Sequence, residues 1–183
     1  MILAIHQPNF FPWYPYFQKM LRADVFVFLT YCQFERGSYT NRFQLNGWHT
    51  MSVSAKTEAI KDKKYLNPDY DWMKIKKRLY NYNLGIFDKY ISESLSDTNI
   101  GIITEIVKRL KIKTELMMDT ETYLTNTERL IDICETHGAD TYLSGPGARR
   151  YMDLDLFKKH DIKVIFNEHD FGIQTNNSII QRL

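Results

Sequence analysis

Short apolar runs and amphipathic segments alternate along the first 30 residues of the chain and predict strands joined by a helix. Residues 2–5 form an apolar run, which should end before Pro8 because proline cannot continue a central strand. Apolar residues then recur at helical spacing as far as Ala23, and a second apolar run spans 25–29. Strand, helix and strand in close succession form a βαβ unit, so we expect the two strands to be parallel.

The rest of the chain continues this alternation after a hairpin signal. Asn46-Gly47 separates two extended stretches and predicts a β-hairpin within residues 39–55. Helices are then predicted over 67–79, 86–95, 100–117, 127–137 and 152–159, and strands over 142–143 and 163–167. The expected fold is α/β: a mostly parallel sheet flanked by helices in a Rossmann-like three-layer arrangement, with the hairpin as an insertion.

Length and composition suit one domain spanning 1–183, because the sequence contains no repeat, linker or low-complexity stretch. No apolar run approaches the roughly 20 residues that cross a bilayer, and the N-terminus lacks the pattern of a signal peptide. Cys32 and Cys134 match no redox or zinc spacing, which suits a reducing compartment. We therefore expect a cytoplasmic protein without a membrane span.

Charge and motifs argue against a nucleic-acid partner and a metal site. The net charge is only +2, too small to attract nucleic acid nonspecifically. The basic cluster Lys74–Arg78 falls on an amphipathic segment and is typical of a solvated helix face. No HExxH motif, paired CxxC motif or histidine-rich cluster occurs, so no metal site is expected.

Ligands of open parallel sheets bind at the carboxyl ends of the strands. Three polar segments follow predicted strands, namely 6–13, 30–42 and 144–151, and by analogy with such folds we expect them to share one edge. In the first, His6 is a candidate general acid or base, or a structural histidine bonded to the backbone. Gln7 and Asn9 are candidates for binding a ligand through their amides, or for stabilising the turn.

The second and third segments carry a thiol, several cations and a glycine-rich turn. Cys32 is a candidate nucleophile if a nearby cation lowers its pKa, and otherwise a packing residue. Arg36 and Arg42 could clamp a phosphate or carboxylate, or remain solvated. Ser144-Gly145-Pro146-Gly147 could receive a phosphate on its backbone N–H groups or form only a turn, with Arg149 reinforcing an anion site and Asp153 either capping a helix or binding a ligand.

Several of these motifs resemble those of the WbqC-like family, bacterial proteins encoded in surface-polysaccharide gene clusters. The similarity is clearest over 1–56 and 138–166. It covers Ala4–Trp13, Arg22–Phe28, Gln33-Phe34, Asn41-Arg42 and Tyr142–Pro146 with Tyr151 and Asp153. Family members usually have a longer aromatic segment before an ending like 177–180, whereas here Phe171 lies only a few residues before it. If the missing segment covers the site in the family, the departure implies a shortened, less active or differently specific member.

The resemblance implies transfer of an acyl or glycyl group to the amine of a nucleotide-linked amino sugar in O-antigen (lipopolysaccharide) synthesis. The expected partners are a sugar nucleotide and an acyl donor, either a carrier-protein thioester or an ATP-activated acid; the cofactor is left open. Residues implied to line the site are His6, Gln7, Asn9, Gln33, Asn41, Arg42, Ser144 and Gly145.

We hypothesise that His6 deprotonates the amine, Asn9, Asn41 or loop N–H groups stabilise the oxyanion, and arginines hold the diphosphate. Two alternatives remain open. One is a noncatalytic module that binds a sugar nucleotide or carrier protein; the other is an ATP-dependent enzyme of the nucleotidylyl-transfer or ligase type, suggested by the strand-end histidine and the later Ser-Gly loop.

Overall fold

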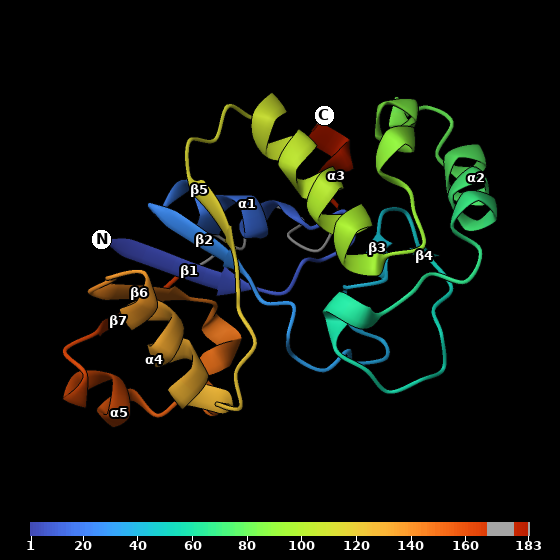
Figure 1. Cartoon of the computed structure of the whole chain (residues 1–183). Helices are drawn as coiled ribbons and strands as arrows, with labels where there is room; N and C mark the ends of the chain where they lie inside the picture. Colours follow the sequence, from blue (N-terminus) through green and yellow to red (C-terminus); the bar gives the residue numbers. More distant parts are fainter. Residues whose placement is uncertain (168–177, 183) are drawn as a thin grey trace.

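A parallel five-stranded sheet in the order β5-β2-β1-β6-β7 forms the centre of the computed structural model, which describes residues 1–167 and 178–182 (Figure 1). β1 is the middle strand, paired in parallel with β2 through Leu3–Val25 and with β6 through Leu3–Tyr142. Every residue of β2 is buried, as expected for a strand covered on both faces. The strands are β1 (Ile2–His6), β2 (Val25–Phe28), β5 (Glu115–Met118), β6 (Thr141–Ser144) and β7 (Lys163–Phe166).

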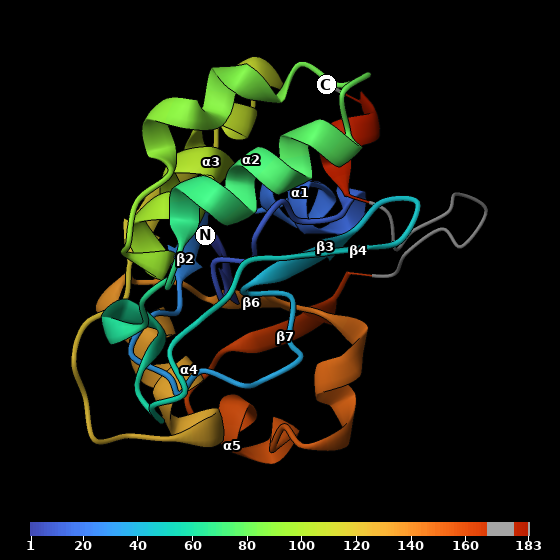
Figure 2. The same ribbon diagram turned by 90° about the vertical axis from the view of Figure 1, so that its right-hand side faces the viewer.

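Helices cover both faces of the sheet, so the α/β prediction is confirmed. Helices α1 (Tyr14–Leu21) and α3 (Leu95–Arg109) lie on one face, and α4 (Asn126–Thr136) and α5 (Leu154–Lys159) lie on the other (Figures 1 and 2). Each face has its own apolar core, with Phe17, Phe26 and Ile103 on the first side and Val27, Ile131 and Phe157 on the second. No helix within 1–167 and 178–182 is long and apolar enough to cross a bilayer.

The chain between β2 and β5 contains the predicted hairpin, formed by β3 (Arg42–Gln44) and β4 (Trp48–Thr50). Its turn lies at Asn46 and Gly47, whose φ angles of 52° and 121° belong to the left-handed region that this dipeptide favours. Beyond the hairpin lies α2 (Pro68–Arg78). Rings of this excursion pack on the loop after β1: Phe11 stacks on Trp72 at 5.5 Å and meets the edge of Phe87 at 4.9 Å.

The middle of the chain departs from the sequence prediction in two places. The helix expected over 100–117 ends at Arg109, Lys111 adopts a φ of 54°, and Leu116 lies in the edge strand β5. β5 is only four residues long and half-exposed, so it has no continuous apolar run to mark it. In place of the helix expected over 86–95 there is a 3₁₀ helix, Leu84–Tyr90. Leu95 instead begins α3, which Ser94 caps by accepting the N–H of Asp97. The other 3₁₀ helices are Ile60–Asp62, Pro146–Arg150 and Ile179–Arg182.

Gly101 in α3 provides a test of this packing. A Cβ atom at Gly101 would lie 2.5 Å from Cδ1 of Tyr90, closer than carbon atoms pack. We expect Gly101→Ala to lower the free energy of unfolding, because the steric cost of about 1–3 kcal/mol exceeds the gain in helix propensity of about 1 kcal/mol. Urea denaturation measures the change, with Gly85→Ala, where the nearest atom lies at 4.0 Å, as the control. Equal stability of the two variants would contradict the prediction.

Candidate functional site

The carboxyl end of β1 is the point where the order of the sheet reverses. β2 and β5 continue on one side of β1, and β6 and β7 continue on the other. In open α/β sheets the crevice at such a switch point is where ligands bind. Two cavities flank this end, and both are lined by Ile5, His6, Tyr142 and Tyr151. The Lys19 cavity, of about 450 Å³, also includes Lys19, Gly145 and Asn167, and the Cys32 cavity, of about 540 Å³, also includes Gln7, Cys32 and Arg129.

His6 is the last residue of β1 and stands between the two cavities. Its Nδ1 donates to the carbonyl oxygen of Gln7 at 3.0 Å, and the same oxygen accepts the hydroxyl of Tyr16 at 3.0 Å. Because a carbonyl can only accept, Nδ1 carries the proton and the lone pair is on Nε2. Burial, followed by the charge of Lys19, lowers the pKa of His6 to about 3, so the imidazole is neutral at physiological pH.

Lys19 was not among the residues singled out from the sequence. It lies on the buried side of α1, is only 4% exposed, and its Nζ donates to the carbonyl oxygen of Ile5 at 2.7 Å. Burial lowers its pKa to about 7. The spacing in the sequence could have indicated its burial. Lys19 follows Tyr16 by about one helical turn, so both side chains lie on the same buried side of α1.

Asn167 also lines the Lys19 cavity and was likewise missed. It directly follows β7, is 2% exposed, and its Oδ1 accepts a hydrogen bond from Arg22 at 2.7 Å. Its backbone N–H donates to the carbonyl of Ser144 at 2.8 Å, which joins the ends of β6 and β7. Its position at a strand end was the signal, because polar residues there face the ligand edge of the sheet.

The half-buried Cys32 lines the Cys32 cavity. Gln7 Nε2 donates to Cys32 Sγ at 3.3 Å, and Sγ lies 3.6 Å from the carbonyl oxygen of Leu29. Burial raises the pKa of Cys32, so the group is a thiol at neutral pH. The condition for a nucleophilic cysteine, a net lowering of its pKa by a cation, is therefore not met, and the geometry favours the packing interpretation.

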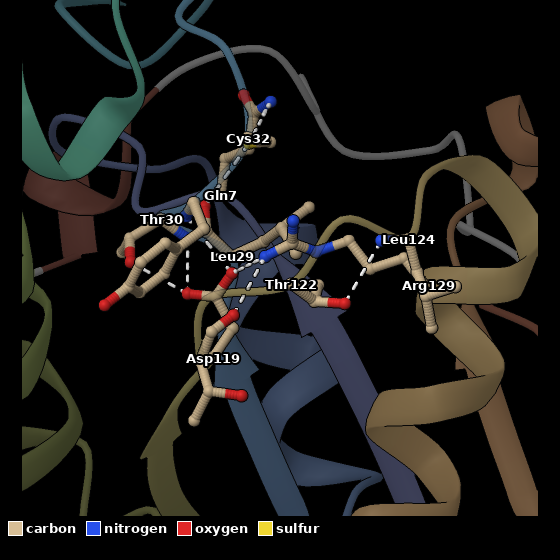
Figure 3. Close-up of polar contacts among 10 residues, drawn as sticks. Gln7, Leu29, Thr30, Cys32, Asp119, Thr122, Leu124 and Arg129 are labelled. Atoms are coloured by element: carbon tan, nitrogen blue, oxygen red, sulfur yellow. Dashed lines mark hydrogen bonds and ion pairs between the residues drawn. The ribbon is translucent and has the colours of Figure 1, made fainter.

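Asp119 directly follows β5 and connects it to the loop after β2 and to α4 (Figure 3). Its carboxylate accepts the N–H and hydroxyl of Thr30 at 2.7 and 2.8 Å and the N–H of Tyr31 at 3.1 Å. Arg129 from α4 pairs with it, and both side chains are buried. Asp119, Thr30, Tyr31 and Arg129 together form a largely buried polar cluster, the Asp119 hub. It was missed because the sequence prediction placed a helix where β5 lies. In the described part of the chain, no cluster of three His, Cys, Asp or Glu side chains could hold a metal.

The structure brings together six of the predicted site residues. His6, Gln7, Cys32, Gln33, Ser144 and Gly145 line one or both cavities. The other five line neither. Asn9 is buried, and Asn41 donates to the carbonyl oxygen of Met51 at 2.8 Å. Arg36 donates to the carbonyl oxygen of Ala55 at 3.3 Å, and Arg42 donates to that of Gly37 and stacks over Trp48 at 4.1 Å. Arg149 lies over the ring of Phe166 at 4.3 Å.

Arg149 belongs to a segment that lines the Lys19 cavity, but its own side chain lies over Phe166. Arg36, Asn41 and Arg42 lie elsewhere because aromatic packing directs their segment away from the sheet edge. Phe10 and Phe34 are buried in the core with the hairpin, so the chain between 34 and 42 leaves the edge soon after Gln33. Asp153 caps α5, accepting the N–H groups of Asp155 and Leu156 at 3.0 Å each. The short segment around Phe171 lies outside the described residues.

Comparison with known proteins gives a family and one uncharacterised relative. The model of the WbqC-like protein family matches residues 7–175. The chain is 28% identical over 190 residues to the uncharacterized protein Rv1507c of Mycobacterium tuberculosis, covering 92% of this chain and 82% of that protein. No solved structure matches.

Proposed function

Because the chain belongs to the WbqC-like protein family, we propose that it is a transferase that forms an amide on the amino group of a nucleotide-linked amino sugar. The observation that supports this proposal is the position of neutral His6 between two adjacent cavities. A reaction between two substrates needs adjacent binding sites and a proton acceptor where they meet. Both volumes lie in the range of small-molecule sites.

In the proposed step, the sugar amine attacks the carbonyl carbon of the acyl donor, and a C–N bond forms. Nε2 of His6 takes a proton from the attacking nitrogen, while the hydrogen bond from Nδ1 to Gln7 O holds the ring in place. The bond from the carbonyl carbon to the thiolate or phosphate leaving group then breaks, and that group receives the proton. Because burial lowers the pKa of His6 to about 3, the imidazole is a weak base and passes the proton on as the leaving group departs.

Mass spectrometry tests this function. dTDP-amino-sugar mixtures are incubated with the protein and either glycine plus ATP or a glycyl-carrier thioester. We expect a product heavier by one glycyl group, and a rate lower by about 10²–10⁴-fold in His6→Ala, because general acid–base catalysis contributes a factor of that size.

His160→Ala is the matched control, since that histidine lies on the surface with 40% of its side chain exposed and pairs with Glu135. Full turnover in a folded His6→Ala variant would remove histidine from the mechanism. Binding of the sugar nucleotide with no mass increment from either donor would instead favour the noncatalytic binding module.

One observation favours nucleotidylyl transfer as a second candidate. The strand order, third-second-first-fourth-fifth along the chain, is that of sheets that bind nucleotides at the switch point beside the first strand. Such an enzyme would release pyrophosphate from ATP in the presence of its acceptor. A coupled pyrophosphate assay with ATP and the amino-sugar nucleotide but no glycine distinguishes it, because amide formation has no acid to activate in that mixture and releases no pyrophosphate.

A further inference from the structure

The Lys19 cavity has an unbalanced charge. Among the described residues that line it, Lys19 is the one cation and there is no acidic side chain. His6 from β1, Tyr16 from α1 and Tyr142 from β6 also line it, together with Tyr151. Burial lowers the pKa of His6 and raises the pKa of Tyr16 and Tyr142, so none of these three is an anion at neutral pH. The cavity therefore offers a positive group and nothing that opposes an anion.

The ammonium group of Lys19 also has unused hydrogen-bonding capacity. It has three donors, and within the described part of the chain its Nζ bonds only to the carbonyl of Ile5. Burying an ammonium without an opposite charge is costly, and packing does not require it, because an apolar side chain of similar length would fill the same space. A lysine at this position is explained if its ammonium pairs with an anionic group of a bound ligand.

The 145–147 loop forms another part of the cavity wall, with open space at its glycines. Gly145 and Gly147 both line the cavity, and a Cβ atom at either would meet no other atom of the described chain within 4 Å. Gly145 has an ordinary φ of −77°, so the fold does not require glycine there. The missing side chains leave room for a ligand to approach the backbone, as glycines do beside phosphates in nucleotide-binding turns.

We propose that the Lys19 cavity binds a phosphoryl group of the substrate, with the Lys19 ammonium as its counter-charge and the 145–147 loop as part of the wall that the group contacts. The inference deepens the proposed function, because it places the diphosphate of the nucleotide-linked substrate in this cavity. The acyl donor then occupies the Cys32 cavity across His6. A compact ammonium beside a glycine-flanked backbone suits phosphate better than a planar carboxylate, which is matched by arginine.

Binding should be accompanied by proton uptake. The pKa of Lys19 is about 7 in the empty cavity, so most molecules carry a neutral amine at pH 8. A bound phosphoryl anion favours the charged form and raises the pKa of Lys19 again. Each bound anion therefore takes up close to one proton at pH 8 and far less at pH 6.

Calorimetric titration of the full chain with inorganic pyrophosphate at pH 8, in Tris and in HEPES, measures this uptake. The two buffers differ in ionisation enthalpy, so the difference in heat gives the number of protons bound. We expect between half and one proton per pyrophosphate in the wild type. Lys19→Met should lose at least ~10-fold in affinity together with the uptake, since a charge-assisted hydrogen bond contributes about 1.5–3 kcal/mol. Lys19→Arg, charged throughout, should bind without uptake.

Two further variants separate binding from folding. Gly145→Ala should keep the wild-type melting temperature and bind pyrophosphate more weakly. Lys158→Met removes a lysine whose side chain is 76% exposed and should change neither quantity. No binding of pyrophosphate, unchanged affinity in Lys19→Met, binding without proton uptake, or tighter binding of malonate than of pyrophosphate would each overturn the proposal. Because this measurement needs no turnover, proton-linked binding without any transfer product would reject the proposed function alone.

Discussion

Asp119→Ala is expected to lower the free energy of unfolding by about 3–5 kcal/mol, because it leaves a buried guanidinium without its partner. The carboxylate, directly after β5, accepts bonds from Thr30 and Tyr31 in the loop after β2 and from Arg129 in the first turn of α4. Its removal leaves the buried N–H of Thr30 unpaired as well. Urea denaturation followed by circular dichroism measures the loss.

The double variant Asp119→Ala/Arg129→Met should recover part of this loss, since removing both charges leaves no uncompensated ion in the interior. Asp155→Ala is the matched control: it breaks an exposed pair with Lys158 and should change stability by less than about 0.5 kcal/mol. If Asp119→Ala proved no more destabilising than Asp155→Ala, the Asp119 hub would have no structural role.

The same hub connects stability to the site. Thr30 and Tyr31 begin the loop that carries Cys32 and Gln33, and Arg129 itself lines the Cys32 cavity. The ion pair thus fixes two walls of that cavity, one from the end of β2 and one from the start of α4. This arrangement allows the site to be formed by residues that are far apart in sequence.

The elements with strong local signals were predictable from the sequence. The βαβ unit of β1, α1 and β2 has continuous apolar runs on either side of a helical period, and Asn46-Gly47 specifies its turn through two positive φ angles. β5 has no such signal: its four residues are partly exposed, and it becomes a strand only because β2 offers an unpaired edge. Pairing across almost 90 residues of intervening chain does not appear in local periodicity.

The candidate site was predictable near the carboxyl ends of the strands. The predicted residues that line a cavity end a strand or follow one within five positions: His6, Gln7, Cys32, Gln33, Ser144 and Gly145. Arg36, Asn41 and Arg42 share a segment with Cys32 but lie beyond the point where Phe34 enters the aromatic core. Lys19 and Arg129 were missed because they reach the edge from helices, where a lysine or arginine in the pattern is usually solvated.

Lys19 should also make the free energy of unfolding depend on pH. The protein is most stable where the amine of Lys19 is neutral, whereas the proposed phosphate binding uses the charged ammonium. In the unfolded chain a lysine has a pKa near 10.4, whereas burial lowers that of Lys19 to about 7 in the folded protein. Between these values the unfolded state binds one more proton than the folded state, so stability rises with pH. The slope from this one group is about 1.4 kcal/mol per pH unit between about pH 7 and 10, and below pH 7 the full cost of the buried charge remains.

Lys19→Met removes this dependence, because methionine fills a similar volume without a charge. We therefore expect the variant to be more stable than the wild type at pH 7, with the difference shrinking by about 1.4 kcal/mol for each unit toward pH 9.5. His6, with a pKa of about 3, contributes nothing in this range, since it is neutral in both states above its unfolded value. Urea denaturation of both proteins at several pH values measures the difference, with Lys158→Met as a control expected to remain parallel to the wild type. A difference that stays constant from pH 7 to 9.5 would mean that the pKa of Lys19 is not lowered in the folded protein. The proposal of proton-linked phosphate binding would then lose its basis.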